Sequence, residues 1–374
     1  GISRGLSAIL GIAGKRENRA SARTETRAVL ALLQVSDYGL EVQPFIPIRG
    51  EEGYGLSDAA VERCLESKPR PSLLITVDCG TASGEQIERL AAEGIDVIVV
   101  DHHETGPGGR PPAVAVVNPK LGDDYGYLCS AGVVFKLAHA LLKRRRIEGV
   151  DLKDVLDLVA VATVADIVPL IDENRMLVRH GLRRLPQTVN PGLNALMEVS
   201  GISGYASSSD VGFRIGPRIN AAGRMDAPED ALKALMTDCR EVAVSMAEQL
   251  DQHNRRRQKH EQQMHEEALR LLDEESAVDE APVIVVGSRQ WHPGVVGIVA
   301  SKLMRTYHKP SFVIAFGEDG FGKGSGRSIE GVSLVDAIDS CRLLLEAGGG
   351  HHEGGAELIQ EPPNSKVTVL TYDT

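Results

Sequence analysis

Two apolar runs in this sequence end directly on side chains that can bind a metal ion or transfer a proton. The first run is Ser72–Val77 and the second is Ile95–Val100. The residues that follow them are Asp78, Asp101, His102 and His103. Such runs are typical of buried parallel strands, whose carboxyl ends line the crevice in which α/β proteins bind ligands. A carboxylate beside two imidazoles suits Mn²⁺, Fe²⁺ or Zn²⁺, although a polar turn that ends a strand would look the same.

A further carboxylate lies in an apolar setting. The segment 151–164 predicts an unusually apolar, buried helix, and it runs into Asp166. Burying an aspartate among apolar neighbours is costly unless it has a partner. Asp166 therefore adds a further carboxylate to Asp78 and the group Asp101, His102 and His103. Two carboxylates and an imidazole make a divalent-metal site that keeps open positions for water and phosphate.

Length and composition describe an ordinary globular protein. The 374 residues, 42% of them hydrophobic and 25% charged, are enough for two or three domains. No apolar run approaches about 18 residues, so no membrane span is expected. The 5 cysteines are scattered and never spaced as Cys-x-x-Cys, which indicates reduced thiols in a cytoplasmic protein. The net charge of −11 argues against a broad DNA-coating surface but leaves a narrow basic channel open.

The alternation of strands and short helices predicts the fold. Besides the two apolar runs, strands are expected at 6–13, 41–47 and 111–118, and helices at 57–67, 83–93 and 130–145. This pattern indicates an α/β fold with a parallel sheet. The expected organisation is a first domain over 1–226, a long connecting helix over 227–277 and a smaller α/β domain over 278–374.

Three further segments contain candidate phosphate contacts. The candidates are Arg214, Arg218, Asn220, Arg224, Lys323, Arg327, Gly350 and His351. Guanidinium forks suit phosphate oxygens, although structural ion pairs would use the same arginines. The segments 322–328 and 348–356 are so rich in glycine that we expect loops whose N–H groups approach an anion, or else flexible turns. A helix is expected between them, at 333–347.

Ten segments, in order, resemble the RecJ type of the DHH/DHHA1 phosphoesterase superfamily. They are EEGYGLS (51–57), ITVDCG (75–80), VDHHETG (100–106), VVNPK (116–120), SAGVVFKL (130–137), ADIVPL (165–170), FRIGPRINAAGRM (213–225), WHPGVVGIVASKL (291–303), KGSGRS (323–328) and GGHHEGGA (349–356). The resemblance implies a parallel-sheet DHH domain joined by the long helix to a smaller DHHA1 domain, with a DNA channel between them.

The resemblance also implies an activity and a role for each motif residue. RecJ proteins are exonucleases that use two Mn²⁺ or Mg²⁺ ions and degrade single-stranded DNA from the 5′ end. By motif, Asp78 would bridge the metals, and His102 and Asp166 would complete one site. Asp101 and His103 would support the ligands or face the substrate. Arg218 and Asn220 would hold the scissile phosphate region, and Gly350 and His351 would help to place the DNA.

The front of the chain departs from the RecJ pattern. RecJ proteins carry an Asp-x-Asp-Gly motif after the first strand, and the alignment places it at Glu17–Ala22, where Arg19 and Ser21 replace the aspartates. No Asp-x-Asp occurs anywhere before Asp78. We therefore expect one metal site, with the second absent or weak. We also expect a truncated second domain without the oligonucleotide-binding barrel that bacterial RecJ proteins append.

These features leave three functions to compare. The first is a single-stranded-DNA exonuclease, impaired by the loss of the first motif. The second is a nuclease-dead homologue that binds single strands or a replisome partner such as the GINS complex. The third is a small-nucleotide phosphodiesterase, which the segment 213–225 disfavours because it points to RecJ more than to the small-substrate relatives.

Overall fold

The computed structural model describes most of the chain. The described residues are 7–12, 41–47, 52, 55–105, 108–122, 126–146, 150–224, 228–274, 281–318, 321–341, 345–351 and 354–360. The chain divides into two compact units, Gly1–Asn254 (unit 1) and Arg255–Thr374 (unit 2). The boundary lies inside α12 (Arg240–Glu274), a helix of 35 residues where the sequence predicts a long connector. Within the described ranges, no helix combines the length and apolar character that crossing a membrane would need.

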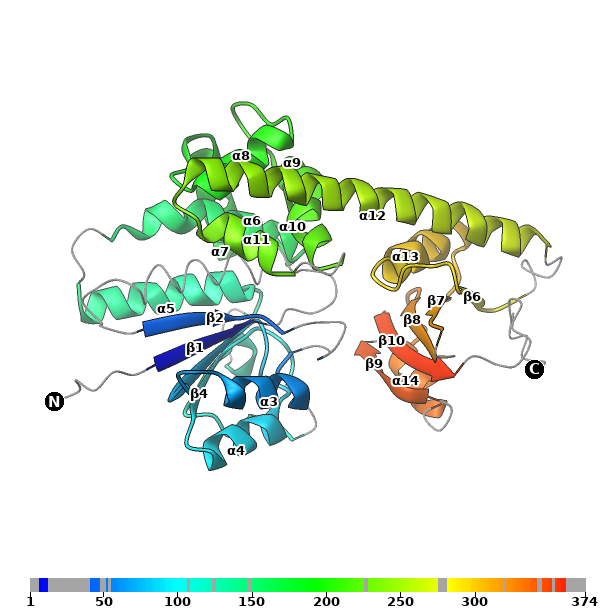
Figure 1. The fold of residues 1–374 in the computed structure, drawn as a ribbon, viewed down its shortest axis with the longest axis horizontal. Helices are drawn as coiled ribbons and strands as arrows, with labels where there is room; N and C mark the ends of the chain where they lie inside the picture. Colours follow the sequence, from blue (N-terminus) through cyan, green and yellow to red (C-terminus); the bar gives the residue numbers. More distant parts are fainter. Residues whose placement is uncertain are drawn as a thin grey trace. The chain divides into compact units, whose positions relative to one another are not determined.

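Unit 1 contains a parallel sheet with the strand order β2-β1-β3-β4-β5 (Figure 1). The strands are β1 (Ser7–Ile12), β2 (Glu41–Phe45), β3 (Leu73–Val77), β4 (Asp96–Val100) and β5 (Ala115–Val117). This sheet confirms the predicted fold class. β2 contains Pro44 and lies at the edge of the sheet, where the missing N–H of proline is tolerated.

Helices cover both faces of this sheet (Figure 1). They are α3 (Asp58–Glu66), α4 (Gly84–Ala92) and α5 (Ser130–Arg144). On one face, Val97 and Val99 of β4 pack in a core with α3 and α4. On the other face, Val100 packs with α5. Val97, Val99 and Val100 are buried and Ile98 is half-buried, so β4 is apolar toward both faces of the sheet, as is typical of parallel strands.

The rest of unit 1 is helical and packs around one central helix, α6 (Leu156–Ala165). The surrounding elements are α7 (Asp172–Arg184), α8 (Pro191–Val199), α9 (Ser208–Asp210), the π-helix η4 (Val211–Ile215), α10 (Gly216–Ala222), α11 (Pro228–Met236) and the start of α12. Short 3₁₀ turns are η1 (Pro119–Leu121), η2 (Leu152–Val155) and η3 (Leu185–Gln187). Most of α6 is buried, which confirms the expectation for this apolar segment.

Unit 2 is a smaller α/β unit with the sheet order β6-β7-β8-β10-β9. Its strands are β6 (Ile284–Ser288), β7 (Ser311–Phe316), β8 (Phe321–Arg327), β9 (Leu345–His351) and β10 (Gly354–Gln360). Its helices are α13 (Val296–Tyr307) and α14 (Leu334–Ser340). β6 and β7 are parallel and the other pairs are antiparallel. The last turns of α12 pack with α13 in the core of this unit.

The structure corrects three expectations in unit 2. Residues 322–327 are not a loop but most of β8, and residues 348–351 and 354–356 belong to β9 and β10. The expected helix at 333–347 ends at Ser340. In β8 the reason is packing, because a Cβ at Gly326 would lie 2.6 Å from the ring of Phe312, its partner on β7. The aromatic ring covers the glycine and supplies the packing that a glycine strand otherwise lacks.

Gly181 lets α7 approach α6 closely, and the first prediction concerns this contact. A Cβ at position 181 would lie 2.1 Å from the carbonyl oxygen of Leu156. We expect Gly181→Ala to lower the free energy of unfolding by about 2 kcal/mol, since overpacking costs about 1–3 kcal/mol and outweighs the gain in helix propensity of up to about 1 kcal/mol. Urea denaturation followed by circular dichroism measures the change. Gly108→Ala, where a Cβ would meet open space, is the matched control, and equal midpoints for both variants would contradict the prediction.

Candidate metal centre

The carboxyl ends of β3 and β4 bring the predicted ligands to one place. Asp78 follows β3, and its N–H donates to the carbonyl of Val100, 3.0 Å away, at the end of β4. Asp101 follows β4, and its N–H donates to the carbonyl of Val117 at the end of β5, at 3.1 Å. Because the three parallel strands end in register, the side chains after them share one edge of the sheet.

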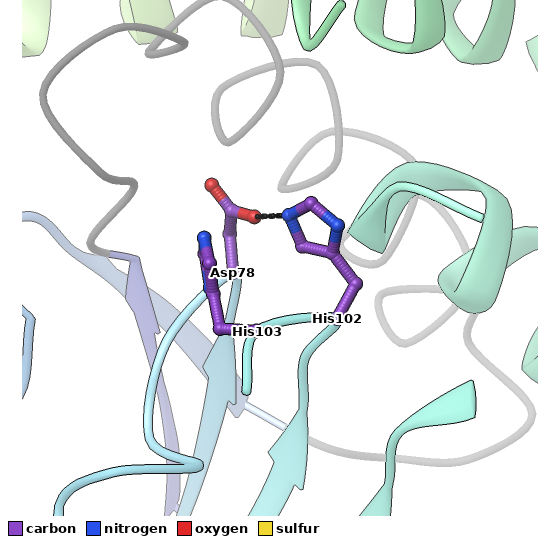
Figure 2. Close-up of side chains that lie close together, drawn as sticks. All are labelled: Asp78, His102 and His103. Atoms are coloured by element: carbon purple, nitrogen blue, oxygen red, sulfur yellow. Dashed lines mark ion pairs between the residues drawn. The ribbon is translucent and has the colours of Figure 1, made fainter. Parts of the chain in front are cut away.

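His102 lies between two carboxylates. Its Nε2 atom is 3.2 Å from Oδ1 of Asp78 and 3.4 Å from Oδ2 of Asp166, the residue that caps the C-terminus of α6. Figure 2 shows Asp78 and His102 facing each other, with His103 beside them. Only 2% of the Asp78 side chain and 12% of the His102 side chain are exposed. The structure therefore brings together the three residues for which the sequence predicts metal binding.

The donor atoms fit a divalent cation. One donor atom each from Asp78, His102 and His103 lies within 4.8 Å of the others. Nε2 of His102 is buried, and no hydrogen bond of normal geometry satisfies it within the described residues. Burial lowers the pKa of His102, but the neighbouring carboxylates, above all Asp78, outweigh it and raise this pKa above its ordinary value. The same negative potential favours a bound cation.

Asp101 organises the turn that carries the two histidines. Its Oδ1 accepts the N–H of His102 at 2.8 Å and Nδ1 of His103 lies 2.6 Å away, while its Oδ2 accepts the N–H of Thr81 at 3.1 Å. Burial alone would raise the pKa of Asp101, but the contacts with His103 and Thr81 lower it well below the usual range. Asp101 is thus buried and its carboxylate oxygens are occupied within the turn, which fits the supporting role that the resemblance implies.

Three polar residues that the sequence analysis left without a role complete the site. The side-chain amide of Asn118 donates to Oγ1 of Thr81 at 3.0 Å and to the carbonyl of His103 at 2.8 Å. The hydroxyl of Ser130, at the start of α5, donates to Oδ1 of Asp78 at 3.0 Å. Asn118 follows β5, so the rule that singled out Asp78 would also have found it. Nothing in the local sequence around Ser130 points to its role.

The arginines of segment 213–225 are held by the protein itself. Arg214 forms an ion pair with Asp210 at 3.0 Å and donates to the carbonyls of Ser200 and Gly201. Arg218 forms an ion pair with Asp251 at 2.8 Å. Their predicted contacts with phosphate stay predictions, and the structural alternative accounts for the observed pairs. Asn220 lies on α10, and Arg224 follows Gly223, the residue that caps the C-terminus of that helix.

The candidate residues of unit 2 lie on β8 and β9. Lys323 and Arg327 belong to β8, and Arg327 donates to Oγ of Ser325 at 3.1 Å. Gly350 and His351 belong to β9, where His351 pairs with Gly354 of β10, and Gly354 in turn pairs with Arg327. Arg19 and Ser21, which stand in place of the first Asp-x-Asp motif, lie outside the described residues.

The comparisons with known proteins agree with this geometry. The DHH family, N-terminal domain, matches residues 18–163, and the DHHA1 domain matches residues 280–356. The chain is 40% identical over 333 residues to the single-stranded-DNA-specific exonuclease RecJ of Bacillus subtilis, which is 88% of this chain and 41% of that protein. The chain therefore spans less than half the length of this relative.

Two solved structures are similar over most of the chain. The crystal structure of exonuclease RecJ bound to manganese has a TM-score of 0.81 and 37% identity, over 94% of this chain and 86% of that chain. RecJ from Thermus thermophilus in complex with Mg²⁺ has a TM-score of 0.72 and 31% identity, over 95% of this chain and 47% of that chain.

The second prediction concerns Asn118. Replacing Asn118 with alanine leaves the carbonyl of His103 without its donor, and an unsatisfied buried group costs about 1–3 kcal/mol. We expect a Tm that is lower by roughly 2–12 °C, at about 2–4 °C per kcal/mol for a unit of this size. Differential scanning fluorimetry measures it. Asn194→Ala, a half-buried site within α8, is the control and should leave the Tm unchanged or slightly raised. Equal Tm values for Asn118→Ala and the parent would show that this hydrogen bond does not hold the turn.

Proposed function

Because the chain belongs to the RecJ type of the DHH/DHHA1 phosphoesterase family, we propose that it is a metal-dependent exonuclease. It hydrolyses phosphodiester bonds of single-stranded DNA from the 5′ end. The observation that carries this proposal is the placement of His102 Nε2 within 3.4 Å of the carboxylates of both Asp78 and Asp166. A buried group of this composition suits Mn²⁺ or Mg²⁺, the ions named for the RecJ structures.

In this proposal, Asp78, His102 and Asp166 hold the ion. When bound, such an ion supplies Lewis-acid activation of water and neutralises charge on the phosphate. The chain's own residues do the orienting. Ser130 donates to Asp78 and fixes the rotation of its carboxylate, while Asp101 and Asn118 hold the turn that presents His102. Partners of this kind behind the ligands commonly set metal affinity.

The absence of the first Asp-x-Asp motif leads us to expect a low nuclease activity. An arginine and a serine at positions 19 and 21 supply neither carboxylate, so we propose one strong metal site and an impaired nuclease. The same observation supports the second candidate, a homologue that binds single-stranded DNA or a replisome partner such as GINS without cutting. Nothing in the described geometry favours the small-nucleotide phosphodiesterase.

The third prediction tests the proposed activity. We expect release of nucleotides from a labelled single strand with Mn²⁺, loss of that release with a chelator, and one binding event in a Mn²⁺ calorimetric titration. Asp78→Asn keeps the shape but removes the ligand charge, so activity should fall about a thousandfold, the equivalent of roughly 4 kcal/mol of barrier.

The control variant carries the same chemical change elsewhere. Asp154→Asn removes an exposed carboxylate that pairs with Arg184, and it should cut like the parent. Two tight, equivalent Mn²⁺ sites would overturn the one-site proposal. A parent that binds single strands but never cuts them would replace the exonuclease with the second candidate.

The fourth prediction concerns the altered motif. If Arg19 and Ser21 occupy the ligand positions, Arg19→Asp together with Ser21→Asp should create a second Mn²⁺ site and raise the cutting rate. Two ions stabilise both the attacking and the leaving oxygen, so we expect a gain of about a hundredfold or more. Calorimetry and the labelled-strand assay measure both changes. Arg23→Asp, next to the motif, is the charge-matched control. A parent as active as the double variant would show that the alignment of 17–22 is wrong.

A further inference from the structure

The two most exposed large apolar side chains in the described part of the chain are Phe213 and Ile167, which are 83% and 79% exposed. The exposure of Phe213 is unusual within this protein. The other phenylalanines are buried or half-buried, at positions 45, 135, 312, 316 and 321. Phe213 is also the most exposed residue of 213–224, the described part of its segment. The first two arginines of this segment form ion pairs within the protein.

Both residues lie at the end of α6 that carries Asp166. Ile167 is the next residue after Asp166 in the chain. Phe213 belongs to η4, which packs on the same end of α6. A Cβ at Gly212 would lie 3.8 Å from Cγ1 of Val164, and a Cβ at Gly216 would lie 3.7 Å from Cβ of Ala165. Two exposed apolar side chains therefore flank the metal-binding end of this helix.

The backbone under these side chains is held firmly. Val211 and Ile215, on either side of Phe213 in the π-helix, are fully buried in the core of unit 1. The carbonyl of Arg214 accepts a hydrogen bond from Arg218 at 2.7 Å, and Arg218 is itself paired with Asp251. π-Helical turns are rare and occur often at functional sites. The open position of Phe213 is thus built into the fold.

The backbone conformation of Ile167 also indicates a functional surface at this end of α6. Its φ is 56°, in the left-handed region that β-branched residues rarely adopt. Backbone strain of this kind is unfavourable and is concentrated at functional sites. Ile167 is strained and 79% exposed, so within the described residues its side chain gains little packing. A bound molecule beside Asp166 would cover this apolar side chain.

We propose that Phe213 stacks on an unpaired base of the single strand beside the metal centre, with Ile167 as a neighbouring apolar contact. This inference rests on the proposed function and extends it, because the stacking contact would explain why the protein binds single strands in preference to a duplex. Every base has a π-face, so stacking on phenylalanine is independent of sequence. In a duplex both faces of an internal base are covered by its neighbours, so the contact is available only to an unstacked base.

The test compares two strands of equal length, an oligothymidylate and the same backbone without bases. Binding of the 374-residue chain is measured by fluorescence anisotropy, with Ca²⁺ in place of Mn²⁺ to slow hydrolysis. We expect Phe213→Ala to bind the oligothymidylate about tenfold more weakly, the scale of one lost base stack. Affinity for the abasic strand should not change, because its phosphates are intact. Phe213→Tyr should keep the parent's affinity for the oligothymidylate, because it keeps an aromatic ring. Phe213→Leu should bind as weakly as Phe213→Ala.

Val189→Ala is the matched control. Val189 is 70% exposed but lies beside Thr188, whose hydroxyl bonds Asp157 at the opposite end of α6. This variant should bind both strands like the parent. If Phe213→Ala loses the same affinity for both strands, or if Phe213→Leu binds as tightly as the parent, base stacking is overturned. Either result would favour a contact of Phe213 with protein. A parent that binds neither strand would overturn the proposed function, and this inference with it.

Discussion

The burial of two carboxylates around one imidazole is the constraint on which this structure depends. Asp78 and Asp166 approach His102 from two different elements, a strand end and a helix end. Taking such charges out of water costs several kcal/mol each unless a cation and hydrogen bonds compensate them. The arrangement is reasonable only where positive charge is supplied, by a proton on the imidazole or by a metal ion.

The surrounding polar residues hold the turn that carries the imidazole in place through hydrogen bonds. Asp101 has its own oxygens occupied by backbone N–H groups and His103, so it fixes the turn after β4. Asn118 ties the same turn to Thr81. The candidate ligands are therefore supported by a set of hydrogen bonds behind them, and positioning of this kind is what metal-assisted catalysis requires.

The helical half of unit 1 links the metal site to the candidate substrate surface. α6 carries Asp166 at its end, and the π-helix η4 packs on that end through Gly212 and Gly216. Arg214 and Arg218 of this segment form ion pairs within unit 1, while Phe213, next to Arg214 in the chain, is 83% exposed. In the proposed arrangement, Arg214 and Arg218 stabilise the scaffold through ion pairs, and the ring of Phe213 contacts the single strand.

The sequence by itself determined the parallel sheet, the buried α6 and the convergence of Asp78 and His102, because strand periodicity and strand ends are local properties. Tertiary structure alone decided the rest. The glycine-rich segment of β8 forms a strand because Phe312 and Phe316 lie opposite Gly326 and Gly322. Ser130 joined Asp78 across 52 positions of the chain, and Arg218 found Asp251 across 33. Such pairings depend on how distant elements pack, and no local pattern records that.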